Sequence, residues 1–542
     1  MGQIGQRVKY DSFAIIVLVT IAVLFVINSL IFRQSTEAIE PVVNSVDAIS
    51  PSQGPSSGGT RVTLTGTDFI GSAGMDKISS GWGEHACGIY LWQVYCWGNN
   101  SYGQLGNGTY DSSLVPVAVD TNGVLAGKTM VDVSVGADYS CALDVVGMAY
   151  CWGNNALGQL GIDDDQVTNS LTPLVIDFSN ALAGKTILQI TSGSDYNCVI
   201  ASDNLAYCWG ADSRGALGIG SSSVGHSFAP VAVDASGVLF GKQIQQISAG
   251  FWHACAVDTD GKAYCWGNDV SYQLGSGAPT GVSFSPVAVD MSGELLGKSV
   301  KQIASSQDHT CAIDTEGKAF CWGNNLNGEL GDGLQTGFMP SPVAVDMSGE
   351  LLGETIESIY TGGVYGYGYS CAITTSEQLY CWGANIQGEL GIGSFQLSLE
   401  PVLVDTFGPE LSTNTIKLLS TNRSTVCAIG TNGETYCWGD NSAGKFGNGN
   451  TNSSTVPVMI DMSDMPKDIV TKVYLGGNLC TNLIVHSSTC ISCTAPMHAK
   501  GMVDVAIMTL GGKKFSISGG YYYYEDNNGH MILGVPNTGK SI

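Results

Sequence analysis

Short apolar segments separated by glycine-rich polar stretches recur along most of this chain. Residues 246–255 read Gln-Ile-Ser-Ala-Gly-Phe-Trp-His-Ala-Cys, and a second apolar run follows at 263–266 after the polar residues 258–262. Runs of this length, bounded by glycine and aspartate, predict β-strands joined by tight turns. Related phrases return every 55 to 60 residues through seven units. Such a period predicts a repeat protein whose units bury their faces against their neighbours in a closed array of blades.

Two cysteines, nine or ten residues apart, stand in every repeat, and the second is always followed by Trp-Gly. The segment from Cys255 to Cys265 is symmetrical about Asp260, so a hairpin centred there places the cysteines opposite each other and leaves a three-residue loop ending in Gly261. Opposed Cα atoms on antiparallel strands lie roughly 4.5 to 5.5 Å apart, within disulfide range. We therefore expect seven cross-strand disulfides: Cys87 with Cys96, Cys141 with Cys151, Cys198 with Cys208, Cys255 with Cys265, Cys311 with Cys321, Cys371 with Cys381, and Cys427 with Cys437.

Reduced cysteines that hold a metal ion are the alternative. They require short Cys-x-x-Cys or Cys/His clusters, and the repeats contain none, so no metal is expected. Paired cysteines in this number persist as disulfides only in an oxidising environment. We therefore expect the repeats to lie outside the cytoplasm.

An apolar segment near the N-terminus supports this location. Residues 13–32 carry no charge and would span about 30 Å as a helix, the thickness of a bilayer core. Arg7 and Lys9 precede the segment and only Arg33 follows it closely, which predicts a cytoplasmic N-terminus and an exported remainder. A cleaved signal peptide is the alternative. The apolar stretch exceeds the usual length of about 7 to 15 residues, which favours an uncleaved anchor.

The composition fits a large exported β protein and limits its partners. The 542 residues include 72 glycines, and 22 basic against 47 acidic side chains leave a formal charge of -25. A chain of this length can bury a sizeable core. A surface this acidic repels phosphate backbones, so nucleic acid is not expected as a partner.

A longer phrase shared by the repeats points to a family. Residues 152–161 and 322–331 both contain Trp-Gly-Asn-Asn followed by Gly, Gln or Glu, Leu and Gly, and residues 247–253 contain the order apolar, two small, Gly, two variable, His. These phrases resemble the regulator of chromosome condensation repeat family over residues 77–461. The resemblance implies an all-β fold, a seven-bladed β-propeller. Here the position two beyond the histidine, normally apolar, is cysteine in every repeat.

The flanking segments resemble a second family in two pieces. Residues 51–69 contain Pro-x-x-Gly-Pro, Gly-Gly-Thr and Gly-x-x-Phe, and residues 490–496 and 521–524 supply Cys-Ile-Ser-Cys-Thr-Ala-Pro and four tyrosines. This order is similar to that of an immunoglobulin-like IPT/TIG domain, which implies a small β-sandwich interrupted by the propeller. We expect the propeller's first and last strands to meet in a closing blade, which would hold the two junctions together. The expected organisation is a cytoplasmic tail (1–12), a transmembrane helix (13–32), the first part of the IPT/TIG domain (43–70), the propeller (77–461), the second part of the IPT/TIG domain (472–525) and a disordered tail (526–542).

Three cysteines remain outside the repeats. The IPT/TIG resemblance implies a disulfide between Cys480 and Cys493, which leaves Cys490 free. The stretch 490–493 is formally Cys-x-x-Cys but lacks the βαβ pattern of a redox domain. Pairing through Cys490, within or between chains, stays open.

The signatures of common enzyme classes are missing from the sequence. There is no Gly-x-Ser-x-Gly, no His-Glu-x-x-His and no phosphate loop leading into a helix. His85, His253 and His309 share one repeat position that holds tyrosine in other blades, which is typical of packing or hydrogen bonding between strands. We therefore expect neither an enzyme nor a bound cofactor.

Surface recognition is the remaining expectation. The loop before the first cysteine of each pair is five residues long in most repeats but grows by four in the sixth, where it contains tyrosines on a glycine-rich backbone, as paratopes do. Neighbouring repeats place aromatic and acidic residues at the same loop, a rim that would suit a basic protein, a cation or a sugar. Packing and solvation of the blade edges is the alternative. The candidate rim residues are Trp82, Glu84, Asp138, Asp195, Phe251, Trp252, Asp308, Tyr365 and Tyr367.

Three functions then compete. The preferred hypothesis is a single-pass cell-membrane protein, anchored through residues 13–32, whose disulfide-stapled propeller binds an extracellular protein or glycan. The family resemblance implies a second, guanine nucleotide exchange on a small GTPase. The expected topology separates the propeller from cytosolic GTPases, and a fold does not determine a function. The third is inhibition of a secreted enzyme by docking over its active site.

Overall fold

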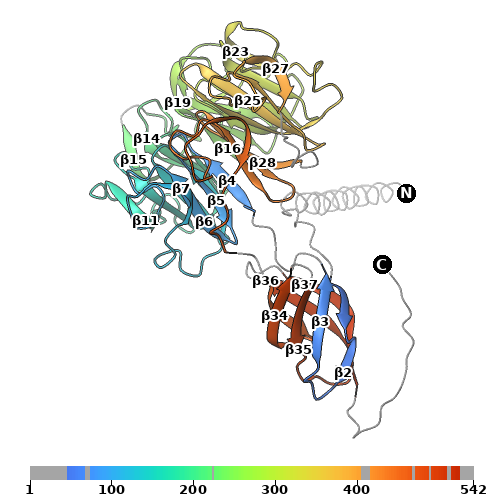
Figure 1. Cartoon of the computed structure of the whole chain (residues 1–542). Coiled ribbons are helices and arrows are strands. Elements are labelled where there is room, and N and C mark those ends of the chain that lie inside the picture. Colours follow the sequence, from blue (N-terminus) through green and yellow to red (C-terminus); the bar gives the residue numbers. More distant parts are fainter. Residues whose placement is uncertain are drawn as a thin grey trace, which may run out of the picture. The chain divides into compact units, whose positions relative to one another are not determined.

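A computed structural model describes residues 46–66, 74–221, 225–404, 415–466, 470–487, 490–509 and 514–524. These residues form strands and turns and contain no α-helix. The strands build two units (Figure 1). One is a propeller from β4 to β31, and the other is a sandwich from β1 to β3 together with β32 to β37.

The propeller consists of seven four-stranded antiparallel sheets, and each sheet uses four strands that are consecutive in sequence. Blade 1 is β4 (Lys77–Ser80), β5 (His85–Tyr90), β6 (Gln93–Gly98) and β7 (Ser113–Ala118); blade 2 is β8 (Met130–Val135), β9 (Tyr139–Asp144), β10 (Ala149–Asn154) and β11 (Asn169–Val175). Blade 3 is β12 (Ile187–Ser192), β13 (Tyr196–Ala201), β14 (Ala206–Ala211) and β15 (His226–Ala232); blade 4 is β16 (Ile244–Ala249), β17 (His253–Asp258), β18 (Ala263–Asp269) and β19 (Gly281–Ala288). Blade 5 is β20 (Val300–Ser305), β21 (His309–Asp314), β22 (Ala319–Asn325) and β23 (Gly337–Ala344). Blade 6 is β24 (Ile356–Val364), β25 (Tyr367–Thr374), β26 (Leu379–Gly383) and β27 (Ser398–Leu403); blade 7 is β28 (Ile416–Thr421), β29 (Thr425–Gly430), β30 (Thr435–Gly439) and β31 (Ser454–Met459).

The first strand of every blade faces the propeller axis. Residues of these seven strands line a central cavity of about 260 Å³. Hydroxyl groups join the inner strands. The N–H of Val135 donates to Ser79 Oγ at 3.1 Å, and the N–H of Ser192 donates to Ser134 Oγ at 2.8 Å. The small polar residues of the inner strands therefore link neighbouring blades around the axis.

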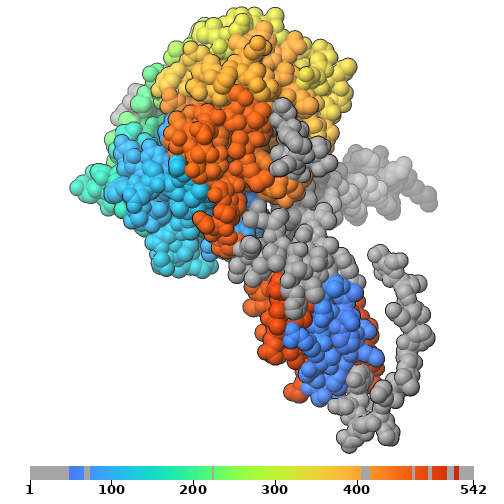
Figure 2. All heavy atoms as spheres, viewed as in Figure 1, coloured from blue at the N-terminus to red at the C-terminus, as the bar shows by residue number. Residues whose placement is uncertain are grey.

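The ring closes between blade 7 and blade 1. The N–H of Ser80 donates to Ser420 Oγ at 2.9 Å, and in Figure 2 the orange blade 7 lies beside the blue blade 1. The expectation that the first and last strands share a closing blade is wrong, because β4 belongs to blade 1 and β31 to blade 7. Each repeat encodes all four strands of its own blade in order, so no strand remains to complete another blade.

The paired cysteines face each other as their spacing predicts. In blade 4, Cys255 lies opposite Cys265, and the N–H of Asp258 donates to the carbonyl of Lys262 at 2.9 Å, which leaves the three-residue loop 259–261. Gly261 in that loop has a φ of 73°, which favours glycine.

All seven expected cross-strand disulfides are formed, with Cα atoms 4.0 to 4.1 Å apart. Each bridge joins the second and third strands of one blade. In blade order, Cys87 is bonded to Cys96, Cys141 to Cys151, Cys198 to Cys208, Cys255 to Cys265, Cys311 to Cys321, Cys371 to Cys381, and Cys427 to Cys437. The prediction drawn from the repeat spacing is therefore confirmed in every blade.

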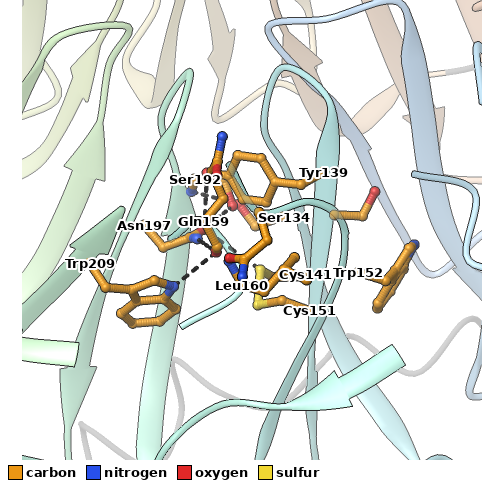
Figure 3. Close-up of a disulfide and its surroundings, with 12 residues drawn as sticks. Ser134, Tyr139, Cys141, Cys151, Trp152, Gln159, Leu160, Ser192, Asn197 and Trp209 are labelled. Atoms are coloured by element: carbon orange, nitrogen blue, oxygen red, sulfur yellow. Dashed lines mark hydrogen bonds between the residues drawn. A yellow bond between two sulfur atoms is a disulfide. The ribbon is translucent and has the colours of Figure 1, made fainter. Parts of the chain in front are cut away.

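The tryptophan after each second cysteine joins its blade to the preceding one. In all seven blades the indole Nε1–H donates to a main-chain carbonyl of the preceding blade at 2.7 to 3.0 Å. Figure 3 shows Trp209 of blade 3 reaching Gln159 of blade 2 beside the bridge between Cys141 and Cys151. The last residue of the Gln-Leu-Gly phrase, Gly161 in blade 2, packs against the indole ring of Trp209. A Cβ on Gly161 would lie 2.7 Å from the indole nitrogen of Trp209, so no other residue fits there without a shift.

The sandwich combines strands from both sides of the propeller segment. One sheet has the order β1-β3-β35-β34 and the other the order β2-β37-β36-β32-β33. Leu64 pairs with Ile491 across the two chain segments, and both are buried with Val505 and Tyr523. The strands are β1 (Val46–Ser50), β2 (Gln53–Pro55), β3 (Arg61–Gly66), β32 (Val470–Leu475), β33 (Asn478–Leu479), β34 (Thr481–Ser487), β35 (Cys490–Thr494), β36 (Gly501–Thr509) and β37 (Lys514–Tyr524).

The expected disulfide between Cys480 and Cys493 is not formed in the structure, where both are buried free cysteines. Unlike the propeller pairs, the two residues are not opposed in register, because Thr481 pairs with Thr494 and Cys480 precedes the strand. The thiols are nevertheless neighbours, and a hydrogen bond with Cys493 together with burial raises the pKa of Cys480. The side chain of Cys490 lies outside the described residues.

The expected anchor at 13–32, the tail at 1–12 and the tail at 526–542 also lie outside the described residues. Within the part of the chain that the structure describes, no helix is long and apolar enough to cross a membrane.

Candidate functional site

The nine candidate rim residues lie in the connections between the first and second strands of the blades, or at their ends. Antiparallel topology brings all of these connections to one end of the propeller, which we call the rim. The loops touch one another through their backbones. The N–H of Ala137 donates to the carbonyl of Ser194 at 2.9 Å, and the N–H of Phe251 donates to that of Ser306 at 3.0 Å.

Aromatic side chains meet at the rim across the propeller axis. The rings of Trp82, from blade 1, and Phe251, from blade 4, are 5.4 Å apart edge to face, and Phe251 contacts Trp252 at 4.7 Å. Trp82 is only 9% exposed and also lines the central cavity. The guanidinium of Arg214 lies 5.0 Å from the centre of the Trp252 ring. These rings therefore pack against one another and against a cation of the same chain.

Two rim carboxylates are held by neighbouring side chains. Glu84 forms an ion pair of 2.9 Å with Lys445, which is buried and also pairs with Asp440 at 2.7 Å. Asp195 accepts hydrogen bonds from Ser194 Oγ at 2.7 Å and from Gln159 Nε2 at 3.4 Å.

Asp138 is the half-buried carboxylate beside them. Burial raises its pKa, and the charges of Asp195 and Glu84 add to the rise. The mutual repulsion of these carboxylates favours a cationic group nearby.

The enlarged connection of blade 6 is a strand extension and not a loose loop. β24 is nine residues long where β16 has six, and its pairing with β25 continues to Val364 opposite Tyr367. Tyr365 and Gly366 form the two-residue turn, with φ values of 50° and 80°. Tyr365 is 64% exposed and Tyr367 47% exposed. We call residues 363–368 the tyrosine hairpin.

Neighbouring blades hold the tyrosine hairpin from both sides. The N–H of Gly366 donates to Asp308 Oδ2 at 3.0 Å, and Asn327 Nδ2 donates to the carbonyl of Gly366; both partners belong to blade 5. From blade 7, the guanidinium of Arg423 lies 5.9 Å from the centre of the Tyr365 ring. Asp308 therefore positions the hairpin, and the two tyrosines are the candidate residues that reach solvent most fully.

Sequence reasoning missed three exposed aliphatic residues that follow the third strands of three blades. Val270, Leu326 and Ile386 follow β18, β22 and β26 in three consecutive blades and are exposed. All three occupy the fourth position after the tryptophan of their repeat. An alignment of the repeats reveals these three aliphatic residues, because the other four blades hold small residues at the same position: Ser101, Ala156, Ser213 and Ser442.

The three histidines at the shared repeat position bridge blades. His85 Nε2 lies 2.8 Å from Ser140 Oγ, and His253 Nε2 lies 2.9 Å from Thr310 Oγ1, each in the following blade. Burial lowers the pKa of both imidazoles to about 3, so they are neutral. The prediction of packing or hydrogen bonding between strands is confirmed, and the structure adds that the bonds run between blades. Among the residues that the structure describes, no three metal-ligating side chains cluster.

Comparisons with known proteins agree with this architecture. The RCC1-like domain family matches residues 93–481, and the IPT/TIG domain family matches residues 45–131 and 448–524. The ultraviolet-B receptor UVR8 of Arabidopsis thaliana is 30% identical over 336 residues, which cover 62% of this chain and 70% of the receptor. Protein pim1 of Schizosaccharomyces pombe is 28% identical over 422 residues, covering 71% of this chain and 72% of pim1.

A solved structure shows the same fold. Prp20p from Saccharomyces cerevisiae superimposes with a TM-score of 0.58 at 20% identity, covering 75% of this chain and 92% of Prp20p.

Proposed function

The chain belongs to the RCC1-like domain family, and on that premise we propose that it is a binding protein whose propeller recognises a protein partner outside the cell. In this proposal residues 13–32 anchor the chain in the cell membrane and the rim is the recognition surface. Seven disulfides support the extracellular location, since bridges in this number persist only in oxidising surroundings. Prp20p, which shares this fold, has binding properties toward Gsp1p and histones, and on this ground we propose a protein as the partner.

The tyrosine hairpin is the observation that carries the proposal. Folded proteins bury large aromatic side chains where they can, yet this chain extends two strands to hold Tyr365 and Tyr367 in solvent. Asp308, Asn327 and Arg423 fix the hairpin in advance, so little conformational entropy is lost when a partner binds. Exposed tyrosines on a rigid support are typical binding anchors.

Surrounding residues define the chemistry of the partner. Val270, Leu326 and Ile386 add exposed apolar area in blades 4 to 6, the last of which carries the tyrosine hairpin. Asp138 and Asp195 leave the rim acidic, and the whole chain carries a formal charge of -25. We propose a protein surface with an apolar centre and basic side chains around it. A sugar that stacks on the hairpin is the second candidate, because about half or more of each tyrosine side chain is exposed to solvent.

Affinity capture from intact cells tests the proposal. The full chain, a Tyr365→Ala/Tyr367→Ala variant and a Tyr102→Ala/Tyr110→Ala variant are compared. Tyr102 and Tyr110 are exposed on blade 1, so the control variant also replaces two exposed tyrosines by alanine. We expect the first variant to lose its cross-linked protein partners by tenfold or more while the blade 1 variant keeps them, on the scale of about 1.4 kcal/mol per factor of ten. Equal capture by all three proteins would contradict the proposal, and loss of binding to a glycan panel alone would favour the sugar.

A further inference from the structure

The tyrosine hairpin rests on a buried carboxyl group of blade 5. Glu329 follows β22 and is fully buried. A Cβ built on Gly368 would lie 3.1 Å from Glu329 Cγ and 2.9 Å from His309 Nδ1. The glutamate stem and the imidazole therefore pack directly against the hairpin backbone, one residue after Tyr367.

Other blades show what this position normally does. In blade 4 it is Gln273, whose Oε1 accepts the N–H of Ser271 at 2.8 Å and whose Nε2 donates to the carbonyl of Gln307 in the next blade at 3.1 Å. In blade 2, Gln159 likewise accepts from a neighbouring N–H and donates to Asp195. In blades 2 and 4 the glutamine amide thus fastens the rim loop of the following blade, whereas in blade 1 Gln104 Nε2 has no hydrogen-bond partner among the described residues.

Glu329 keeps only half of this arrangement. Its Oε2 accepts the N–H of Asn327 at 2.7 Å, as the glutamine oxygen does. Its Oε1 is buried and has no hydrogen-bond partner among the described residues. An ionised carboxylate cannot donate, whereas a protonated carboxyl can replace the amide donor.

The charged groups around Glu329 favour the proton. Burial raises the pKa of Glu329 to about 7, the charge of Asp308 adds to the rise, and backbone N–H groups, including that of Gly368, oppose it. His309, across Gly368, supplies no charge, because burial lowers its pKa to about 3 and both of its nitrogens lie within hydrogen-bond distance of serine hydroxyls. Arg423 lies over the Tyr365 ring at the turn.

We propose that a proton on Glu329 fastens the tyrosine hairpin to blade 5, so that the recognition surface is held most firmly at mildly acid pH and loosens as this carboxyl ionises. The neutral carboxyl can stay buried beneath Gly368, whereas an ionised carboxylate there would leave a buried oxygen without a hydrogen-bond partner. The attachment itself is a property of the fold; its consequence for partner binding rests on the proposed function.

The sign follows from the two states of the hairpin. When the hairpin lifts, Glu329 meets water and its pKa returns towards the usual value of about 4.3. The attached state therefore holds more protons between that value and about 7. Its extra stability is fully present below the lower pKa and is lost as pH rises through the upper one. Between pH 6 and pH 8 the attachment equilibrium should fall roughly tenfold.

Hydrogen exchange of the hairpin amides at pH 6 and pH 8, normalised for the intrinsic rates, tests the proposal on the full chain. We expect protection of residues 363–368 to fall about tenfold in the wild-type protein between these values. Glu329→Gln should abolish this fall and retain protection, because it restores the residue found in blades 1, 2 and 4. Glu389→Gln is the matched control. Burial raises the pKa of Glu389 to about 7 as well, but the carboxylate whose charge adds to that rise is Asp440 of blade 7, so the fall at the hairpin should persist.

The measurement needs no partner, so its failure is separate from a failure of the proposed function. A wild-type hairpin whose normalised protection does not change between pH 6 and pH 8 would overturn the proposal, even if the Glu329 variant could not be folded. The same pH dependence in wild type and Glu329→Gln would also overturn it.

Discussion

The indole Nε1–H of Trp266 in blade 4 donates a hydrogen bond to the carbonyl oxygen of Ala216 in blade 3 at 2.9 Å, and both residues are buried. The equivalent bond joins the other six pairs of neighbouring blades. It explains why Cys-Trp-Gly and Gln-Leu-Gly recur together in the repeats. One phrase supplies the donor, and the other supplies the carbonyl of the preceding blade.

Replacing Trp266 by Phe should therefore weaken the contact between blades 3 and 4. The phenyl group keeps most of the apolar contact but leaves the Ala216 carbonyl buried without its donor, which lowers the free energy of unfolding by about 1 to 3 kcal/mol. Denaturant unfolding measures the change. Trp92→Phe, at an exposed turn of blade 1, is the control and should stay within about 0.5 kcal/mol. Equal effects of Trp266→Phe and Trp92→Phe on the free energy of unfolding would show that the interblade hydrogen bond does not contribute to stability.

Removing one disulfide should lower stability without removing the fold. Cys255→Ala/Cys265→Ala opens a loop of about ten residues, for which the chain-entropy argument gives about 3 kcal/mol. The hydrogen-bonded ladder between β17 and β18 remains to hold the hairpin. Thermal unfolding of the double variant, beside Cys480→Ala as a cysteine change that breaks no bridge, measures the effect. An unchanged Tm in the double variant would count against the bridge.

Lys445 is predicted to be the most sensitive charged residue of the rim. It is buried between Glu84 and Asp440, so Lys445→Met leaves two carboxylates without their cation and should destabilise the protein by about 3 to 5 kcal/mol. Chemical denaturation gives the magnitude. Lys318→Met changes an exposed lysine and should have little effect.

The same ion pair predicts a dependence on pH. Burial raises the pKa of Asp440, but the charge of Lys445 and its hydrogen bond outweigh burial and leave the pKa lowered. A depressed carboxyl pKa contributes stability above the unfolded value near 4, and that contribution is lost as pH falls through the folded value. Wild type should therefore lose more stability than Lys445→Met between pH 5 and pH 2. Parallel acid-denaturation curves for the two proteins would contradict this.

Asp308 should hold the tyrosine hairpin through a single hydrogen bond. Asp308→Ala removes the acceptor of the Gly366 N–H and should raise exchange of that amide by about 5- to 10-fold, which corresponds to roughly 1 kcal/mol. Asp308→Asn keeps a side-chain carbonyl oxygen and should have a smaller effect. Site-resolved hydrogen exchange distinguishes the two variants, and identical exchange in wild type and Asp308→Ala would assign the positioning to Asn327 and Arg423.

The local sequence pattern predicts much of the fold but fewer of the contacts at the rim. The symmetry of residues 255–265 predicts the register of the hairpin, because side chains opposite each other on two strands depend only on the turn between them. The contact between Trp82 and Phe251 depends on how seven blades close into a ring, which spacing within one repeat cannot reveal. Cys480 and Cys493 show the same limit, since their relative position depends on sheet register across a bulge and not on sequence order.

Some features of the candidate site can also be predicted from local sequence, whereas others depend on contacts between blades. The insertion before Cys371 marks the tyrosine hairpin, which pairs within blade 6, but the role of Asp308 comes from blade 5, 58 residues before Gly366 in the chain. Glu329 resembles any polar residue of its phrase until its environment is compared with that of Gln273. Repeats help here, because each blade serves as an internal control for the others.

The extracellular location of the disulfide-bonded propeller can be tested on intact cells. A tag fused after Ile542 is labelled with a membrane-impermeant reagent, and the cysteines are mapped by mass spectrometry without reduction. We expect the tag to be labelled without permeabilisation and the seven propeller pairs to be recovered as disulfides. A protected tag together with reduced propeller cysteines would contradict this expectation, and an intracellular partner such as a small GTPase would then become the leading hypothesis.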